Sequence, residues 1–208
     1  MLFVWYKVSF DEKWSHGSAV CETVYFFVEF VCVFPWKCVS LNNQNRGKIM
    51  DGILRKLPIG IQTFEKLREG DYLYVDKTAL VWRIASTETP YFLSRPRRFG
   101  KSLLLSTFEA YFEGKKNLFE GLAIADMEKE WKKYPVLHLD LNAEKYDSPQ
   151  ALVEILSRQL TQWELKYGKG EDEETLSGRF AGVIRRACEQ AGRGVVVLVD
   201  EYDKPLLQ

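Results

Sequence analysis

The side chains best suited to chemistry gather around a short Gly-Lys-Ser run. Gly100, Lys101 and Ser102 match the end of the pattern G-x-x-x-x-G-K-[ST]. In that pattern backbone N–H groups and the lysine bind phosphate oxygens, and the hydroxyl binds Mg²⁺. An apolar run at 90–93 precedes it and a helical pattern at 103–112 follows it, which is the strand–loop–helix context that the pattern requires. The sequence therefore predicts a phosphate-binding loop.

The loop departs from the pattern at one position and carries extra positive charge. Arg95 stands where the first glycine is expected, at a place where the backbone shape disfavours other residues. Arg97 and Arg98 have two interpretations: guanidinium groups that hold phosphate, or solvated and ion-paired surface charges. The predicted nucleotide-binding residues are Arg98, Phe99, Gly100, Lys101, Ser102 and Leu103.

A second candidate group follows a buried strand near the end of the chain. Residues 195–199 are apolar throughout, as expected of a parallel strand covered on both faces, and Asp200 and Glu201 follow directly. Ligands of open α/β sheets bind at the carboxyl ends of strands. Asp200 is therefore predicted to hold Mg²⁺ together with Ser102, and Glu201 to act as the catalytic base that activates water, with Lys101 assisting. The alternative is an ordinary acidic turn.

Strands that alternate with helices predict an α/β domain with a mostly parallel sheet flanked by helices. Strands are expected at 72–75, 90–93, 135–141 and 195–199. Helices are expected at 62–69, 79–85, 101–112, from Pro149 past Trp163, and 176–191. Ser148 should cap the helix that begins at Pro149, and the acidic run 171–174 should favour the start of the last helix.

The first part of the chain differs from the remainder. Residues 1–49 lack a clean period, whereas coherent patterning begins at Met50. We therefore divide the chain into a poorly patterned leader, 1–49, which stands outside the working domain, and a domain at 50–208. The apolar stretch 23–36 is too short to span a bilayer, and no simple signal peptide precedes it.

Composition excludes few functions. The 208 residues carry 29 basic and 29 acidic side chains, so net charge favours neither binding nor avoidance of nucleic acid. The four cysteines form no C-x-x-C pair, which argues against a zinc site and fits a reducing, cytoplasmic setting. Cys188 is expected to be a buried small hydrophobe.

For the remaining polar candidates we mostly expect structural roles. His138 is expected to be a packed, hydrogen-bonded strand residue, and Asp76 with Lys77 to cap a helix. Asp140 follows a strand and has a less favoured interpretation as a site residue. Asp203 is expected to be structural.

Several blocks resemble the bacterial AAA-ATPase-like family over residues 54–208. These blocks are Leu57–Arg68, Tyr74–Thr78, Ser94–Leu104, Tyr111–Gly114, Leu118–Leu122 and Leu198–Leu206. Because the loop of that family begins Arg-Pro-Arg-Arg-Phe, the resemblance makes Arg95 a family trait. It implies that residues 100–102 contact phosphate and Mg²⁺ and that Asp200 and Glu201 are the acidic pair. Relatives commonly carry a C-terminal domain similar to PD-(D/E)XK nucleases, so the resemblance implies a member incomplete at its C-terminal side.

Three functions remain open from the sequence. The first is an ATP-binding P-loop domain that hydrolyses ATP with Mg²⁺. The second is a nucleotide-responsive module that binds nucleic acid or regulates a linked nuclease-like domain without turnover. The third is a small-molecule kinase, against which stands the Asp-Glu pair, since that pair suits water activation better.

Overall fold

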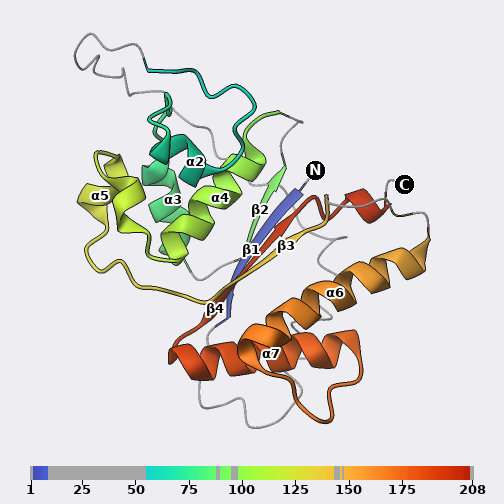
Figure 1. Ribbon diagram of the computed structural model, residues 1–208. Coiled ribbons are helices and arrows are strands. Elements are labelled where there is room, and N and C mark those ends of the chain that lie inside the picture. The colour runs from blue at the N-terminus through green and yellow to red at the C-terminus, as the bar shows by residue number, and fades with distance from the viewer. Residues whose placement is uncertain are drawn as a thin grey trace.

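The structure is a computed structural model, which describes residues 2–8, 55–87, 90–94, 98–142, 146 and 148–206. Its sheet contains β1 (Leu2–Val8), β2 (Tyr91–Ser94), β3 (Val136–Asp140) and β4 (Val195–Asp200), in the order β2-β1-β4-β3. β3 and β4 are parallel, whereas β1 is antiparallel to both of its neighbours. β2, β3 and β4 therefore run in one direction, and their carboxyl ends lie at one edge of the sheet (Figure 1).

This sheet differs from the predicted one in its centre. The sequence indicated no strand at 2–8, yet β1 lies between β2 and β4 and supplies the backbone pairing that both need. Among the described strands, only β3 and β4 form a parallel ladder. The apolar stretch 23–36 and the rest of the leader after Val8 lie outside the described residues. The division of the chain at residues 49 and 50 stays a prediction.

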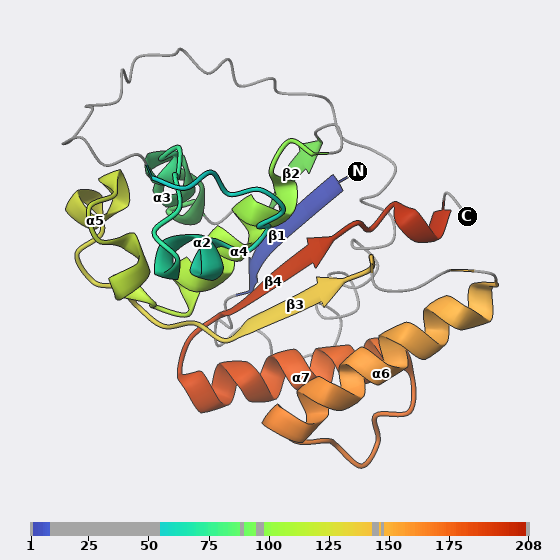
Figure 2. The ribbon, with the colours of Figure 1, turned by 45° about the horizontal axis from the view of Figure 1, so that its top comes forward.

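Helices cover both faces of the sheet (Figures 1 and 2). One face carries α2 (Phe64–Glu69), α3 (Thr78–Ala85), α4 (Lys101–Phe112) and α5 (Ala123–Met127), and the other carries α6 (Pro149–Tyr167) and α7 (Leu176–Ala191). Two short 3₁₀ helices, η2 (Lys116–Phe119) and η3 (Lys204–Leu206), complete the described elements. The α/β class is thus confirmed. None of the helices in the described ranges is long and apolar enough to cross a bilayer.

Strand β4 divides the core into two clusters. Val195, Val197 and Val199 pack into the cluster with α6 and α7. Val196 and Leu198 pack into the cluster with α4. Because successive side chains of a strand point to opposite faces, Asp200 falls on the α4 face. The apolar run at the end of the chain is therefore explained by burial on both faces.

The helix-capping predictions hold at two places. The Ser148 hydroxyl accepts a hydrogen bond from the Ala151 N–H, with Pro149 at the first helical position. The Asp76 carboxylate accepts from the Thr78 N–H at 2.8 Å and also from the Ala123 N–H at 2.8 Å, which joins α3 to α5. Cys188 is buried as expected, and burial raises the pKa of its thiol.

Two local predictions are wrong. Residues 72–75 form no strand and make only an isolated bridge between Lys56 and Tyr72. The acidic run 171–174 ends before α7 begins, and the Thr175 hydroxyl caps that helix instead. Glu173 is drawn away because both of its carboxylate oxygens accept hydrogen bonds from Arg186, at 2.6 and 2.9 Å.

A buried ion pair joins α6 to α7. The Arg179 guanidinium donates to both carboxylate oxygens of Glu164, at 2.7 and 2.8 Å. It also donates to the hydroxyls of Ser157 and Thr161, at 2.7 and 2.9 Å. The side chains of Arg179 and Glu164 are only 12% and 7% exposed. Every partner that this guanidinium has in the described part of the chain lies on α6, and the pair fixes how the two helices pack.

Replacing Arg179 with Met should destabilise the chain strongly. The change leaves the Glu164 carboxylate buried without its partner, which costs about 3 kcal/mol. The free energy of unfolding from urea titration measures the effect. Arg185→Met is the matched control, because Arg185 is 52% exposed and its contact with Glu173 is 3.6 Å long; we expect a change within about 0.5 kcal/mol. Equal losses in the two variants would contradict the structural role of the buried pair.

Stability should also fall in acid through Glu164 and Glu173. Their arginine partners hold the pKa of both carboxyls below the ordinary value of 4.5. A carboxyl with a lowered pKa in the folded state contributes stability above its unfolded pKa and loses it as the pH falls through the folded value. The urea concentration at the unfolding midpoint, measured from pH 7 to pH 3, should decrease once the pH is below about 4.5. Arg179→Met should show a shallower fall, and an unchanged slope would contradict the assignment of Glu164.

Candidate functional site

The predicted phosphate loop meets helix α4 at Gly100. Gly100 has φ +72° and ψ 28°, a left-handed conformation that glycine adopts without strain, and α4 begins at the next residue. The Leu104 N–H donates to the Gly100 carbonyl at 3.0 Å, which closes the first helical turn. Lys101 and Ser102 thus lie in the first turn of a helix, where free N–H groups and the helix dipole favour an anion.

A hydrogen bond joins this turn to the acidic strand end. The Ser102 hydroxyl donates to an Asp200 carboxylate oxygen at 2.8 Å, between residues 98 positions apart. The fold makes this contact possible because Asp200 lies on the face of β4 that α4 covers. The two predicted metal-binding side chains are thus in direct contact, although β2 and β4 are separated by β1.

Lys101 and Glu201 bring further charges to the same place. Lys101 is 6% exposed, Asp200 6% and Glu201 8%. Burial, and next the neighbouring Asp200 charge, raise the pKa of Glu201, while Lys101 opposes the shift. A buried ammonium and two buried carboxylates therefore lie within electrostatic reach of one another. Perturbed, buried ionisable groups are typical of functional sites, although ion-pair networks produce them too.

Two of the four non-glycine residues with positive φ in the described part of the chain lie beside these groups. Arg98 has φ +67° and Glu201 has φ +56°, and neither is a glycine. A left-handed conformation at an ordinary residue costs about 1 kcal/mol or more and persists only where the surrounding structure imposes it. One strained residue lies just before the loop glycine and the other just after the acidic strand. The strain therefore flanks the Ser102–Asp200 contact on both sides.

The other predicted loop residues are placed differently. Phe99 is 62% exposed, and the Leu103 side chain packs against the α4 cluster. The Leu103 side chain thus contributes to the core, whereas the Phe99 side chain is exposed to a ligand. Arg95 and Arg97 lie outside the described residues.

Strand β3 places two more polar side chains on this face. Asp140 pairs in register with Asp200, and its carboxylate accepts from the Asn142 N–H at 2.7 Å. His138 lies two residues before Asp140 on the same face of β3. Its Nδ1 is 3.2 Å from a Glu109 carboxylate oxygen on α4. Burial lowers the pKa of His138, but the hydrogen bond to Glu109 and the charge of Glu109 outweigh burial and raise this pKa overall. The prediction of a packed, hydrogen-bonded histidine is confirmed.

Glu109 was missed by the sequence analysis. It lies seven residues after Ser102, which is two helical turns, so both side chains project from the same side of α4 toward β3 and β4. That spacing was the signal that could have found it. Helix α4 therefore makes two polar contacts with the strand pair, one at Asp200 and one at His138.

The residues fit a magnesium ion. Mg²⁺ prefers hard oxygen ligands and is usually held by one or two protein groups together with phosphate and water. The Ser102 hydroxyl and the Asp200 carboxylate are two such oxygens in contact at a helix N-terminus. In the described part of the chain no three His, Cys, Asp or Glu side chains converge on a metal position. A site that draws its other ligands from a nucleotide needs no such cluster.

Comparisons with known proteins show the family of the chain. An uncharacterized protein in the vnfD 5' region of Azotobacter chroococcum mcd 1 is 46% identical over 154 residues. The match covers 74% of this chain but 30% of that relative, so the chain spans about a third of the relative's length. No solved structure matches the chain. The family model described as Predicted AAA-ATPase matches residues 58–208, and the chain belongs to this AAA-ATPase-like family.

Proposed function

We propose that the domain binds ATP with Mg²⁺ at the first turn of α4 and hydrolyses it. The observation that carries this proposal is the 2.8 Å hydrogen bond between Ser102 and Asp200. It joins a Gly-Lys-Ser helix start to an acidic strand end, and these are the two parts that a P-loop nucleotidase requires. Membership of the AAA-ATPase-like family supports nucleotide binding in general.

Each residue has a role that follows from its position. The free N–H groups of the first turn of α4 bind phosphate oxygens, and the Lys101 ammonium neutralises their charge. Ser102 and Asp200 hold Mg²⁺, which when bound withdraws charge from the phosphates. Glu201 orients the attacking water and accepts its proton. Its burial keeps bulk water from competing for the carboxylate.

A second candidate function is a nucleotide-responsive module without turnover. The observation that favours it is that the relative is much longer than this chain, so ATP bound here has further chain to act upon in such a protein. A linked nuclease-like domain or nucleic acid would be the responding partner. ATP binding with no phosphate release by the wild-type chain would favour this candidate.

Lys101→Ala should weaken ATP binding. Removing a charged hydrogen-bond donor at a buried position costs about 1.5–3 kcal/mol, or roughly 10-fold to 150-fold in Kd. Isothermal titration with Mg-ATP measures the change. Lys66→Ala, an exposed lysine on α2, is the matched control and should bind as the wild type does. Unchanged affinity in Lys101→Ala would overturn the nucleotide site.

Glu201→Gln should separate turnover from binding. The amide keeps the size of the side chain but cannot accept the proton, so kcat should fall by about 10²–10⁴ while the Kd for ATP stays within a few-fold. Phosphate release under saturating Mg-ATP measures kcat. The control is Glu174→Gln, an exposed position before α7. Full activity in Glu201→Gln would remove this residue from the mechanism.

A further inference from the structure

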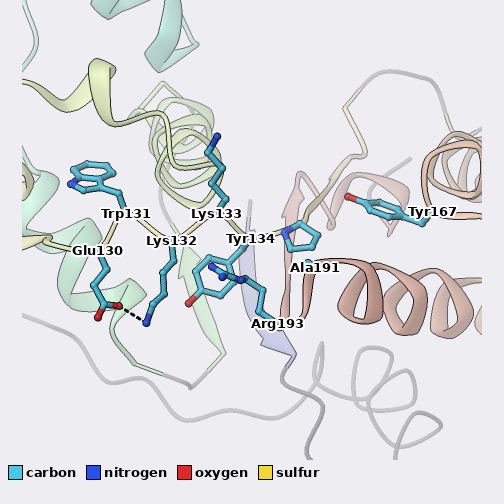
Figure 3. A pocket seen from close by; sticks show the side chains of 9 residues that line it. Glu130, Trp131, Lys132, Lys133, Tyr134, Tyr167, Ala191 and Arg193 are labelled. Atoms are coloured by element: carbon cyan, nitrogen blue, oxygen red, sulfur yellow. Dashed lines mark ion pairs between the residues drawn. The ribbon is translucent and has the colours of Figure 1, made fainter.

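An open groove lies at the end of the sheet remote from the proposed ATP site. It has a volume of about 610 Å³ and is lined by residues 130–135 together with Tyr167, Ala191 and Arg193. Pro135 precedes β3 and Arg193 precedes β4, so the groove lies where these strands begin (Figure 3). Asp200 ends β4, and a strand of that length separates the two places by about 20 Å.

The groove gathers positive charge. Lys132, Lys133 and Arg193 line it and are exposed, whereas Glu130 is the one acidic residue of its lining. Glu130 pairs with Lys132 and raises the pKa of that ammonium, an effect that Arg193 opposes because it is a like charge nearby. Lys132 and Arg193 thus lie within electrostatic reach of each other, whereas the Lys133 side chain points away from both and adds its charge on another side of the groove (Figure 3). Such an arrangement favours an anionic ligand.

The turn that presents the lysines is fixed by strain and packing. Trp131 has φ +47°, which is unfavourable for a residue with a bulky side chain. The Glu128 carboxylate accepts hydrogen bonds from the N–H groups of Glu130 and Trp131, at 2.8 and 3.3 Å. The Trp131 ring packs against Tyr111 and Phe119, with centroids 5.8 and 5.2 Å away. The surrounding structure therefore holds a costly backbone conformation, which is typical of binding sites.

Tyr134 and Arg193 lie against each other in the lining of the groove, and Phe112 packs against Tyr134. The Phe112 and Tyr134 rings meet edge to face at 5.8 Å, and the Arg193 guanidinium lies 5.6 Å from the Tyr134 centroid. Figure 3 shows Arg193 crossing the Tyr134 ring. Arg193 is the exposed one of these three residues. A guanidinium plane backed by an aromatic ring is a surface on which an unpaired base can stack.

We propose that this groove binds single-stranded nucleic acid, with Lys132 and Lys133 on the phosphates and Arg193 beneath a base. The inference does not depend on ATP binding, since the groove shares no residue with the Ser102–Asp200 site. An open groove suits an extended ligand better than a single nucleotide, which usually binds in a more enclosed pocket. Lysines together with an arginine over an aromatic ring favour a nucleic acid over an acidic peptide, which would use the charges alone.

The test is fluorescence anisotropy of a labelled 20-nucleotide oligo-dT probe with the full 208-residue chain. The triple variant Lys132→Gln, Lys133→Gln and Arg193→Gln should lose roughly 10-fold or more in affinity at low salt, and its log–log salt slope should be smaller by about 2. The matched control removes three exposed cations elsewhere, through Lys56→Gln, Lys66→Gln and Arg83→Gln. It should bind within about 3-fold of the wild type.

Further arms separate this proposal from the others. Lys101→Ala should keep its oligo-dT affinity, so loss of the ATP site and loss of the groove are distinguishable. The single variant Lys133→Gln, with its fold checked by circular dichroism, should lower the slope by about 0.7 even if the triple variant is unstable. No binding by the wild type at low salt, or equal loss in the matched control, would overturn the proposal. Displacement of the probe by polyglutamate as readily as by unlabelled oligo-dT would assign the groove to an acidic protein instead.

Discussion

The arrangement of the molecule depends on the double burial of strand β4. Its five apolar residues alternate between two clusters, one beneath α4 and one beneath α6 and α7. This alternation fixes the register of the strand, because a slip by one residue would exchange the two faces. It also fixes the face on which the polar residue after the apolar run emerges. Asp200 therefore meets α4 and not α7.

The position of Asp200 also determines what the start of α4 contacts. Helix α4 packs on β4 with its first turn at the carboxyl end of the strand. That turn contains Lys101 and Ser102. The contact between Glu109 and His138 holds the same helix two turns further along. Two polar contacts within an apolar interface thus fix the rotation of α4 about its axis. Rotation matters because it decides which side chains of the first turn face Asp200.

The two ends of the same strands offer different chemistry. At the carboxyl ends, buried carboxylates and one buried ammonium lie in a small, strained region. At the amino ends, three exposed cations are among the residues that line an open groove. The parallel pair β3 and β4 connects the two places through backbone hydrogen bonds and buried side chains. A ligand at either end therefore contacts segments that enter or leave the same two strands.

Much of the architecture could be predicted from the sequence, because local residue patterns determine many of the helices and strands. Apolar periodicity located α4, α6, α7, β3 and β4, and Ser148 marked a helix start through its own side-chain chemistry. The Gly-Lys-Ser run and the Asp-Glu pair were recognisable because each is contiguous. Where sequence analysis failed, distant partners had overridden local preference. Glu173 pairs with Arg186 rather than opening a helix, and residues 72–75 lack a strand partner beyond one bridge.

The sequence alone determined which residue types were available for the predicted phosphate site and on which kind of element each would lie. Only the tertiary structure decided that Ser102 and Asp200 touch, that Glu109 holds His138, and that cations from two distant segments share one groove. It also decided that β1 lies between β2 and β4. The physical reason is that strand order and helix rotation are set by burial summed over the whole core, which no local window of sequence contains.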